Sequence, residues 1–444
     1  MEALRQRLVP DTYEELREMM GLFERGEMPD YPAGMERHFA VAKKKPEDFK
    51  NHGVVLGISI GGSNTKVMLG AMKDGFLEVR HLRAMENPAQ ATEFDAFMDE
   101  LIANDPAVDR YLRSGEPASI GVSLPMTIID GCPYHPTKIP TLSGMIARTP
   151  EERTPEMRFD CNFKRYLRLR GYPEPGALFY QADGIVAHHG AVSLLDMGEQ
   201  DKTVLCICGT GMANGDERSY LPIALIHNLP EDDGLFPPEE TENRQLNYAV
   251  SGKGIYALMR RAIAERIREE GSALEGKGLE RFFQQVWDSK NVFEVWQTAQ
   301  DPAYSSRRTE EIRAAAGEDG FRELQQIAGM LALRVVQTLG NTIVSTFASM
   351  GPLAPGAQHI LFFEGSIATN RWLNPLIQAD VREKAANRAF FAALGRQPLA
   401  PILMNPSLKP LLPGEGVRQE ELVRADITLM GAVTMIMAQT SEKF

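Results

Sequence analysis

Short apolar runs separated by turn residues fill the first part of the chain and predict β-strands. The runs at 53–62, 66–72 and 76–82 are rich in aliphatic residues and end at residues that favour turns. Helical spacing of apolar residues follows from Ala91 to Ile102, and a fourth strand is predicted at 118–126. The order strand, strand, strand, helix, strand is typical of an α/β protein.

A second cluster of strands is predicted from residue 203, and long helices dominate the chain after it. Apolar spacing predicts helices over 252–270, 278–298 and 319–349, and a further strand over 359–366. The other predicted helices are 1–30, 154–171, 184–196, 370–386 and 425–439. The last of these is apolar all round, which is typical of a buried helix.

The two strand clusters resemble each other and suggest an internal duplication. The glycine-ended strand at 53–62 has a counterpart at 203–211, and each opens a group of strands that leads into helices. Two copies of a β-β-β-α unit predict two similar α/β lobes with a ligand cleft between them. The expected lobes are a small one of 53–180 with 425–444, and a large one of 1–52 with 181–424.

The composition and charge of the chain exclude several classes of protein. Its 444 residues carry a net charge of −12, whereas a nucleic-acid binder needs a net basic face. Four cysteines in so long a chain are no disulfide framework. No apolar run approaches the roughly 20 residues that span a bilayer, and the N-terminus lacks a signal peptide's apolar core. We expect a cytoplasmic enzyme acting on small molecules, a monomer or homodimer, without nucleic-acid or membrane partners.

Glycines and small polar residues follow the first predicted strand. Gly61 and Gly62 let the backbone approach a ligand closely, and their N–H groups suit phosphate oxygens. Ser63 and Asn64 add side-chain donors, and Lys66 adds a positive charge. The alternative is a simple hairpin turn, since Gly-Gly also favours tight turns. The P-loop pattern is absent.

A matching hairpin follows the first strand of the second cluster. Gly209 and Gly211 flank Thr210, whose hydroxyl is a further donor. Alone this segment is a weak signal, but two such hairpins across a cleft are a known way to hold a nucleotide triphosphate. The pair therefore predicts binding of a nucleotide's phosphate groups.

Candidate substrate-binding side chains lie between the two hairpins. Asp183 starts a predicted helix, where it would act as a general base that accepts a hydroxyl proton. The alternative for this carboxylate is N-capping of the helix. Ser123 lies near the end of a predicted strand, and Thr137 and Lys138 lie in a proline-rich loop. Hydroxyls with one ammonium group suit a polyhydroxy ligand, although loop residues of these types are usually just solvated.

The histidines and cysteines do not predict a site. His188 and His189 are adjacent on a predicted helix and point to different faces, which argues against a shared metal. Cys206 and Cys208 lie on one face of a predicted strand and are expected to be buried thiols. We therefore expect no metal ligands among the protein's side chains.

The whole chain resembles the eukaryotic-type hexokinases and glucokinases in the identity and order of its motifs. GISIGGSNTKVML is similar to that family's first phosphate motif and CICGTGMANGD to its second. GVSLPM and HPTKIP resemble the sugar-binding segments, and QADGIVAHHGA the segment with the catalytic aspartate. SGKGIYALMRRAI, FFEGSIATN and LMGAVTMIMA are similar to the helix start after the sugar site, the adenosine motif and the closing interlobe helix.

The resemblance implies an actin-like ATPase fold of the ribonuclease-H type, with two lobes that close on a sugar and Mg-ATP. It implies an ATP-dependent hexose 6-phosphotransferase with glucose as the default substrate. Asp183 would be the base for the 6-hydroxyl, and Lys138 would also offset charge on the transferred phosphoryl group. The implied sugar-binding residues are Ser123, Thr137, Lys138, Asp183, Asn228, Glu231 and Asn247. The implied nucleotide-binding residues are Gly61, Gly62, Ser63, Asn64, Lys66, Gly209, Thr210, Gly211, Gly365 and Ser366.

Five departures from the family's pattern surround this predicted site. The aspartate that orients Mg²⁺ is replaced by Ser59, whose hydroxyl lacks a carboxylate's charge. The asparagine beside the catalytic aspartate is Ala182, and the one after the second hairpin is Ala213. Of the two sugar-binding glutamates, Glu231 fits only with a one-residue shift and the other is Asn247. Two alternatives therefore stay open: a kinase for another polyol or an amino sugar, and a sugar or nucleotide sensor with little turnover.

Overall fold

The computed structural model divides the chain into two compact units. Unit 1 comprises Met1–Met28, Cys206–Ala213 and Pro222–Met404, and unit 2 comprises Pro29–Leu205, Asn214–Leu221 and Asn405–Phe444. The residues that the structure describes are 51–61, 64–87, 93–129, 132–134, 154, 157–195, 197–198, 200–209, 212–216, 250–277, 279, 289–349, 353–393 and 397–441. The helix predicted over 1–30 lies outside the described residues.

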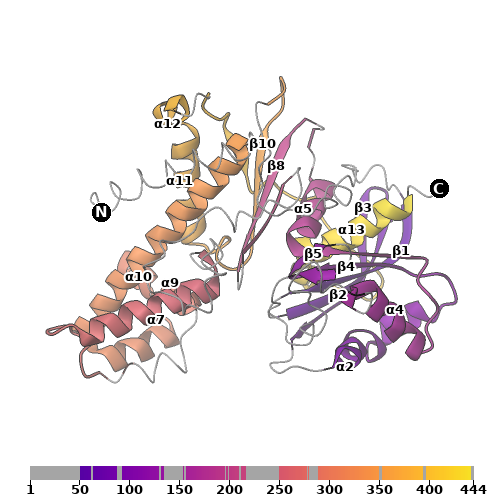
Figure 1. The fold of residues 1–444 in the computed structure, drawn as a ribbon, viewed down its shortest axis with the longest axis horizontal. Coiled ribbons are helices and arrows are strands. Elements are labelled where there is room, and N and C mark those ends of the chain that lie inside the picture. Colours follow the sequence, from indigo (N-terminus) through magenta and orange to yellow (C-terminus); the bar gives the residue numbers. More distant parts are fainter. Residues whose placement is uncertain are drawn as a thin grey trace. The chain divides into compact units, whose positions relative to one another are not determined.

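A six-stranded mixed sheet forms the centre of unit 2 (Figure 1). In order across the sheet, its strands are β12 (Leu412–Pro413), β3 (Phe76–Glu86), β2 (Asn64–Lys73), β1 (Asn51–Ile60), β4 (Ser119–Leu124) and β7 (Ala177–Ala182). β1, β2 and β3 pair as an antiparallel meander, whereas β1, β4 and β7 are parallel. The predicted strands correspond to β1 to β4, and β7 is a strand that the apolar pattern did not predict. A small hairpin joins β5 (Thr127–Ile129) to β6 (Cys132–Tyr134).

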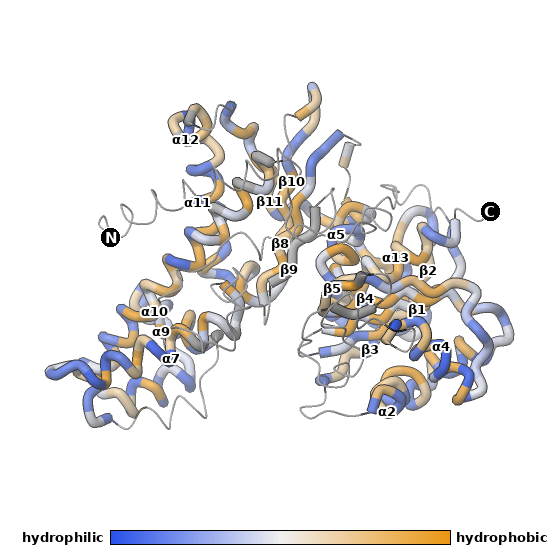
Figure 2. The backbone as a smooth tube through the Cα atoms, viewed as in Figure 1, coloured by the Kyte–Doolittle hydropathy of each residue, from blue (hydrophilic) through white to orange (hydrophobic). Residues whose placement is uncertain are grey.

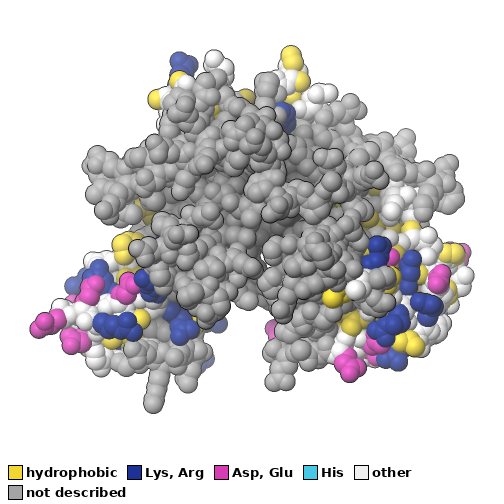
Figure 3. Space-filling model, viewed as in Figure 1, with side chains coloured by type: hydrophobic (Ala, Val, Ile, Leu, Met, Phe, Trp, Pro, Cys, Tyr) yellow, Lys and Arg dark blue, Asp and Glu magenta, His cyan; other side chains and the backbone are white. Residues whose placement is uncertain are grey.

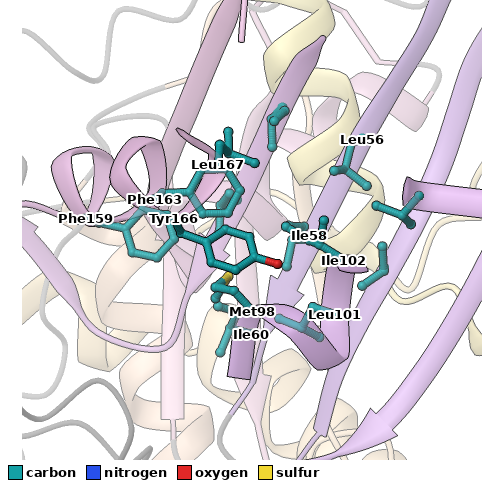
Figure 4. Packing of buried hydrophobic residues seen from close by; sticks show 14 of the residues in the cluster. Leu56, Ile58, Ile60, Met98, Leu101, Ile102, Phe159, Phe163, Tyr166 and Leu167 are labelled. Carbon is teal, nitrogen blue, oxygen red and sulfur yellow. The ribbon is translucent and has the colours of Figure 1, made fainter. Parts of the chain in front are cut away.

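One face of this sheet is packed with large apolar side chains, and we call it the aromatic face. Leu56, Ile58 and Ile60 alternate along β1 and are fully buried there. Phe159 and Phe163 of the covering helix stack with ring centroids 5.6 Å apart (Figure 4). The helices on this side are α2 (Phe94–Met98), the π-helix η3 (Asp99–Ala103), α3 (Pro106–Leu112) and α4 (Phe159–Leu169). This dense core fixes the positions of β1, β4 and β7.

The opposite face carries Gly57, Gly70 and Gly121, and we call it the glycine face. It is covered by α13 (Ile427–Ser441), which in turn packs against α5 (Asp183–Leu194). A Cβ atom at Gly121 would collide with the carbonyl oxygen of Ala432, and one at Gly431 would collide with that of Val186. Glycine is therefore needed where these backbones approach most closely. Figure 2 shows α13 as hydrophobic along its length, which confirms the predicted buried helix.

Contacts group α5 with the six-stranded sheet in unit 2. The expected lobe boundary at residue 181 placed this helix in the other lobe. Its two glycine contacts explain the difference: Gly190 and Val186 of α5 lie directly against the backbone of α13. The C-terminal helix belongs to the same unit as β1.

The described surface of unit 2 around α4 carries basic and acidic side chains side by side (Figure 3). Arg165 of α4 pairs with Asp95 at 2.7 Å, and Arg113 pairs with Asp109 at 2.9 Å. Such exposed pairs contribute little to stability individually. These ion pairs do balance the positive charge of Arg165 and Arg113 with nearby carboxylates.

Unit 1 combines a four-stranded sheet with long helices (Figure 1). The sheet order is β11 (Ile402–Met404), β10 (His359–Glu364), β8 (Lys202–Cys208) and β9 (Met212–Asp216). The unit boundaries fall within β8 after Leu205 and within β9 after Ala213. The described helices are α7 (Gly252–Arg268), α9 (Ser289–Gln300), α10 (Arg307–Ser349), α11 (Leu373–Ala385) and α12 (Arg388–Ala393). α10 begins earlier than predicted and is kinked at Gly317, where φ is +71°.

Within α10, the stretch Arg307–Val344 is long and apolar enough to cross a membrane by length and composition alone. No such stretch was predicted, since no unbroken apolar run approaches the roughly 20 residues that span a bilayer. However, 65% of the apolar window is buried within the protein. A buried core helix of a soluble protein meets the same criterion, so the stretch is weak evidence for a membrane span.

Candidate active site

The carboxyl ends of three parallel strands meet at one edge of the sheet in unit 2. β1, β4 and β7 run side by side, with Ser59 paired to Ser123 and Ser123 paired to Gln181. In α/β sheets, ligands bind outside the carboxyl ends of parallel strands. Gly61 follows β1 directly and Asp183 follows β7 directly. The topology therefore brings the first predicted hairpin, the predicted sugar serine and the predicted base to one edge.

Four polar residues form a row across this edge, which we call the polar row. They are Lys66 on β2, Ser59 on β1, Ser123 on β4 and Gln181 on β7, each in register with the next. Register partners share a face of a sheet, and Ser59 and Ser123 lie two residues after Gly57 and Gly121. The row therefore lies on the glycine face. Ser59, Ser123 and Gln181 are only 5%, 0% and 4% exposed.

Asp183 is the first residue of α5 and is half-buried. Ala182 occupies the N-cap position, so Asp183 is not the N-cap that the alternative interpretation required. The Gly184 N–H donates to Asp183 Oδ1 at 2.8 Å. A carboxylate in the first turn is also favoured by the positive end of the helix dipole. These contacts hold the carboxylate at the carboxyl edge of the sheet.

The hydroxyl of Ser123 is completely buried, and within the described part of the chain it has no hydrogen-bond partner. Leaving a buried hydroxyl unpaired costs about 1–3 kcal/mol. Such a group calls for an explanation, for instance a bound ligand or an ordered water. Ser123 pairs in register with Gln181, and Gln181 lies two residues before Asp183. The unpaired Ser123 hydroxyl is therefore the strongest sign of a ligand at this edge.

The hairpin between β1 and β2 already uses the amide of its first glycine. The Gly61 N–H donates to the Asn64 carbonyl oxygen at 2.9 Å, and Asn87 Nδ2 donates to the Gly61 carbonyl oxygen at 2.7 Å. Asn87 also accepts a hydrogen bond of 2.6 Å from Thr65. Both peptide groups of Gly61 therefore serve the turn. Any phosphate contact of this hairpin is left to Asn64, which is exposed, and to residues outside the described part.

Lys66, a predicted phosphate ligand, is engaged in an ion pair. Its Nζ donates to Asp426 Oδ2 at 2.5 Å, and both side chains are about one quarter exposed. Asp426 also accepts a hydrogen bond from the Leu429 N–H at 2.8 Å, so it caps α13. The sequence analysis assigned no role to Asp426. It ties the polar row to the first turn of the helix that covers the glycine face.

Three loops of unit 1 converge at the end of β8. Gly365 has φ +89°, and a Cβ there would collide with the backbone of Cys208. The N–H groups of Ile367 and Ala368 donate to the Cys208 carbonyl oxygen at 2.9 and 3.2 Å. A Cβ on Gly209 would lie 3.8 Å from the Gly365 Cα. The structure thus places Gly209 beside Gly365 and the exposed Ser366, as two parts of one nucleotide site would require.

The N-terminus of α7 supports the same loop cluster. The Gly252 N–H donates to the Gly209 carbonyl oxygen at 2.7 Å, and Cys208 Sγ donates to the Val250 carbonyl oxygen at 3.0 Å. Ser251 caps the helix by accepting from the Gly254 N–H. The sequence showed the Ser-Gly-Lys helix start, but only the structure shows that it abuts the second hairpin.

The other predicted site residues lie outside the described residues. They are Gly62, Ser63, Thr137, Lys138, Thr210, Gly211, Asn228, Glu231 and Asn247. Their roles remain predictions.

The described residues do not form a cluster of side chains that would hold a metal ion without a nucleotide. They contain no group of three or more histidines, cysteines, aspartates or glutamates that could hold a metal ion. Mg²⁺ prefers carboxylate oxygens and water, whereas Ser59 offers a buried hydroxyl. The two carboxylates at this edge are already engaged, Asp183 with the Gly184 amide and Asp426 with Lys66.

The histidines and cysteines on these elements are structural. His189 is buried between Ser193 and Thr434, each 3.2 Å from its Nδ1, and burial lowers its pKa to about 3. Cys206 and Cys208 are fully buried free thiols, as predicted. Burial raises the pKa of Cys206 to about 12, so its thiolate is not available near neutral pH.

Comparison with known proteins identifies the fold. No protein-family model and no curated protein matches the sequence. The structure is similar to a hexokinase from Schistosoma mansoni complexed with glucose, with a TM-score of 0.57 and 13% identity over 96% of this chain and 95% of that one. It is similar to another hexokinase at a TM-score of 0.56, with 14% identity over 99% of this chain and 100% of that one. For a ROK hexokinase from Thermus thermophilus the TM-score is 0.47, with 15% identity over 88% of this chain and 99% of that one. The protein has the two-lobed actin-like ATPase fold.

Proposed function

We propose that this protein is an ATP-dependent sugar kinase that phosphorylates the 6-hydroxyl of a hexose, with glucose as the first candidate. The observation that carries the proposal is the position of Asp183 at the carboxyl edge of three parallel strands, where the neighbouring strand carries the buried Ser123 hydroxyl, which pairs with no described residue. The fold supports it, since the hexokinases named above share this fold. One of them was crystallised with glucose.

In the proposed reaction, Asp183 accepts the proton of the sugar hydroxyl. The hydroxyl oxygen forms a bond to the γ-phosphorus of ATP, and the bond from that phosphorus to the oxygen bridging to ADP breaks. The products are a sugar phosphate, ADP and the protonated carboxyl group of Asp183, which returns its proton to water. Positioning and charge neutralisation dominate catalysis of this kind. Ser123 would position the sugar by hydrogen bonding one of its hydroxyls.

The loop cluster of unit 1 would bind the nucleotide. Gly209 and Gly365 give the backbone access to phosphate oxygens or to the ribose because neither carries a side chain. Ser366 adds an exposed hydroxyl donor. Mg²⁺ would arrive with the nucleotide and stay bound mainly to its phosphates and to water, because Ser59 offers no carboxylate.

A second function, sugar or nucleotide binding with little turnover, is favoured by one observation. Ser59 stands where the resemblance implies the magnesium-orienting aspartate, and the described residues offer no replacement cluster. A protein without that carboxylate could keep the ligand sites and lose most of the phosphoryl transfer. Substrate-dependent turnover separates the two functions.

The deciding experiment measures ADP release from Mg-ATP with glucose, mannose, fructose, glucosamine or no sugar. We expect release that depends on a sugar, and we expect Asp183→Asn to reduce kcat by about 10²- to 10⁴-fold because the base is lost. Asp95→Asn is the matched control, since Asp95 also lies in the first turn of a helix of unit 2 but on the aromatic face. Glucose binding by calorimetry without ADP release would select the sensor function. Full activity of Asp183→Asn would refute the base assignment.

A further inference from the structure

Gln181 is a buried polar residue that the proposed chemistry has not yet used. It is 4% exposed and lies at the end of β7, two residues before Asp183. Its Oε1 accepts a hydrogen bond of 2.8 Å from the Ala182 N–H. Among the described residues this is the only hydrogen bond of the side chain. The bond fixes the carboxamide by its oxygen, and no described residue accepts a hydrogen bond from its N–H₂ group.

Ser123 is the register partner of Gln181 on the neighbouring strand. Adjacent strands lie roughly 4.8 Å apart, and register partners project from the same face. The Ser123 hydroxyl is fully buried and also pairs with no described residue. Two unsatisfied polar side chains therefore stand next to each other at the carboxyl edge, on the side where Asp183 begins α5. Buried polar groups that lack a protein partner are the ones that a ligand or an ordered water completes.

An apolar cluster lies on the same face of β7, one position before Gln181 on that face. Phe179, on the same face of β7, packs with Ile185, Val186 and Met435 in an apolar cluster beneath α13. A leucine or methionine would continue that cluster at lower cost, because a buried carboxamide must be desolvated. Satisfying the Ala182 N–H is one structural reason for a glutamine. It accounts for the side-chain oxygen and leaves the N–H₂ group unexplained.

We propose that Gln181 is a specificity-determining residue that donates a hydrogen bond from its amide to one hydroxyl oxygen of the sugar other than the hydroxyl that Asp183 deprotonates. This inference rests on the proposed sugar-kinase function. The recognised ligand is a sugar with a free hydroxyl at that carbon. A sugar without this oxygen leaves the Gln181 amide unpaired and binds more weakly, because a buried donor has then lost its water without gaining a partner.

The test compares the full-length wild type with Gln181→Met, Gln181→Glu and Gln297→Met. Gln181→Met removes both the acceptor and the donors, whereas Gln181→Glu keeps the acceptor for the Ala182 N–H and loses the donors. Gln297 is a matched control, because it is 7% exposed and lies on α9 of unit 1. Thermal unfolding checks that each variant is folded. Calorimetry then measures the affinity for the preferred hexose and for each of its monodeoxy analogues.

We expect both Gln181 variants to bind the parent sugar about tenfold more weakly than the wild type does. In the kinase assay, KM should rise more than kcat falls. For one particular deoxy analogue, the variants and the wild type should have the same affinity. That analogue lacks the oxygen that Gln181 recognises. Gln297→Met should leave all affinities unchanged. Loss of affinity in Gln181→Met with full affinity in Gln181→Glu would overturn the proposal and assign Gln181 to capping Ala182. An equal loss for every analogue would overturn it as well.

The design separates failure of this inference from failure of the proposed function. If the wild type binds a sugar without sugar-dependent ADP release, the proposed function fails, and the calorimetric comparison still decides the role of Gln181. If ADP release occurs and the Gln181 variants bind every sugar like the wild type, only the inference fails. If the wild type binds no sugar, both fail.

Discussion

The two faces of the six-stranded sheet in unit 2 are made by the same strands and differ completely in character. On the aromatic face, Leu56, Ile58 and Ile60 of β1 pack against the rings of α4. On the glycine face, β1 contributes Gly57 and Ser59. Alternate residues of a strand project to opposite faces, so each strand supplies the aromatic core with one set of residues and the polar row of the candidate site with the other. The difference teaches that core residues and candidate site residues lie one position apart in the sequence.

The largest expected effects concern packing on the two faces. Phe163→Ala removes a fully buried ring from the aromatic face and should destabilise the protein by about 3–5 kcal/mol. Gly121→Ala adds only one methyl group to the glycine face, but that group meets the Ala432 backbone, which cannot move without shifting α13. We expect it to cost about 3 kcal/mol or more. The shift of the urea unfolding midpoint measures both effects.

Gly53→Ala is the control for this comparison, because a Cβ at Gly53 of β1 would contact nothing within 4 Å. It should leave the unfolding midpoint close to that of the wild type. If Gly121→Ala also left the unfolding midpoint unchanged, α13 would not pack directly against β4, and the proposed difference between the two faces would be wrong.

A smaller effect is expected from restoring a carboxylate on the glycine face. Ser59→Asp places a negative charge in the polar row, opposite Lys66. If the protein is a kinase with a weakened metal site, the Mg²⁺ concentration for half-maximal rate should fall severalfold, because a carboxylate attracts the cation. A titration of ADP release with Mg²⁺ measures it. Ser59→Ala adds no charge and should not lower that concentration, and an unchanged requirement in Ser59→Asp would mean that the metal is held elsewhere.

The smallest effect should come from the ion pair at the end of the polar row. Lys66 and Asp426 remain partly exposed, with side-chain exposures of 22% and 26%. Solvent screening limits the coupling of such a pair to about 1 kcal/mol or less. A double-mutant cycle with Lys66→Met and Asp426→Asn, followed by urea unfolding, gives the coupling directly. A coupling of several kcal/mol would show that the glycine face depends on charge as strongly as the aromatic face depends on packing.

Most elements of the fold follow from the sequence because their apolar periodicity is strong. The three-stranded meander, β4, α5 and α13 appear where the pattern places them. β7 was missed because six residues with a short apolar run do not distinguish a buried strand from a helix end. The start of α10 was missed because its first turns are charged and exposed.

The candidate site was predictable only where a residue's type and position in its motif were informative. Asp183 lies at the start of a predicted helix and Ser123 near the end of a predicted strand, which are positions where catalytic and binding residues are expected. Gln181 gave no signal, since its importance depends on its register with Ser123 across two parallel strands. Asp426 was missed because its partner Lys66 is 360 residues away in the chain. Periodicity carries no information about contacts at that separation.

The kink of α10 at Gly317 has a consequence for how this helix opens. A left-handed residue interrupts the run of backbone hydrogen bonds, so the segment before it and the long segment after it unfold as separate units. The first segment, which spans 307–316, exposes half of its residues and is held in the core mainly by Ile312 and Ala316, whereas Leu324, Ile327 and Phe347 anchor the longer second segment. Amide hydrogens before Gly317 should therefore exchange with solvent deuterium well before those after it, and a protease should cut first at this joint.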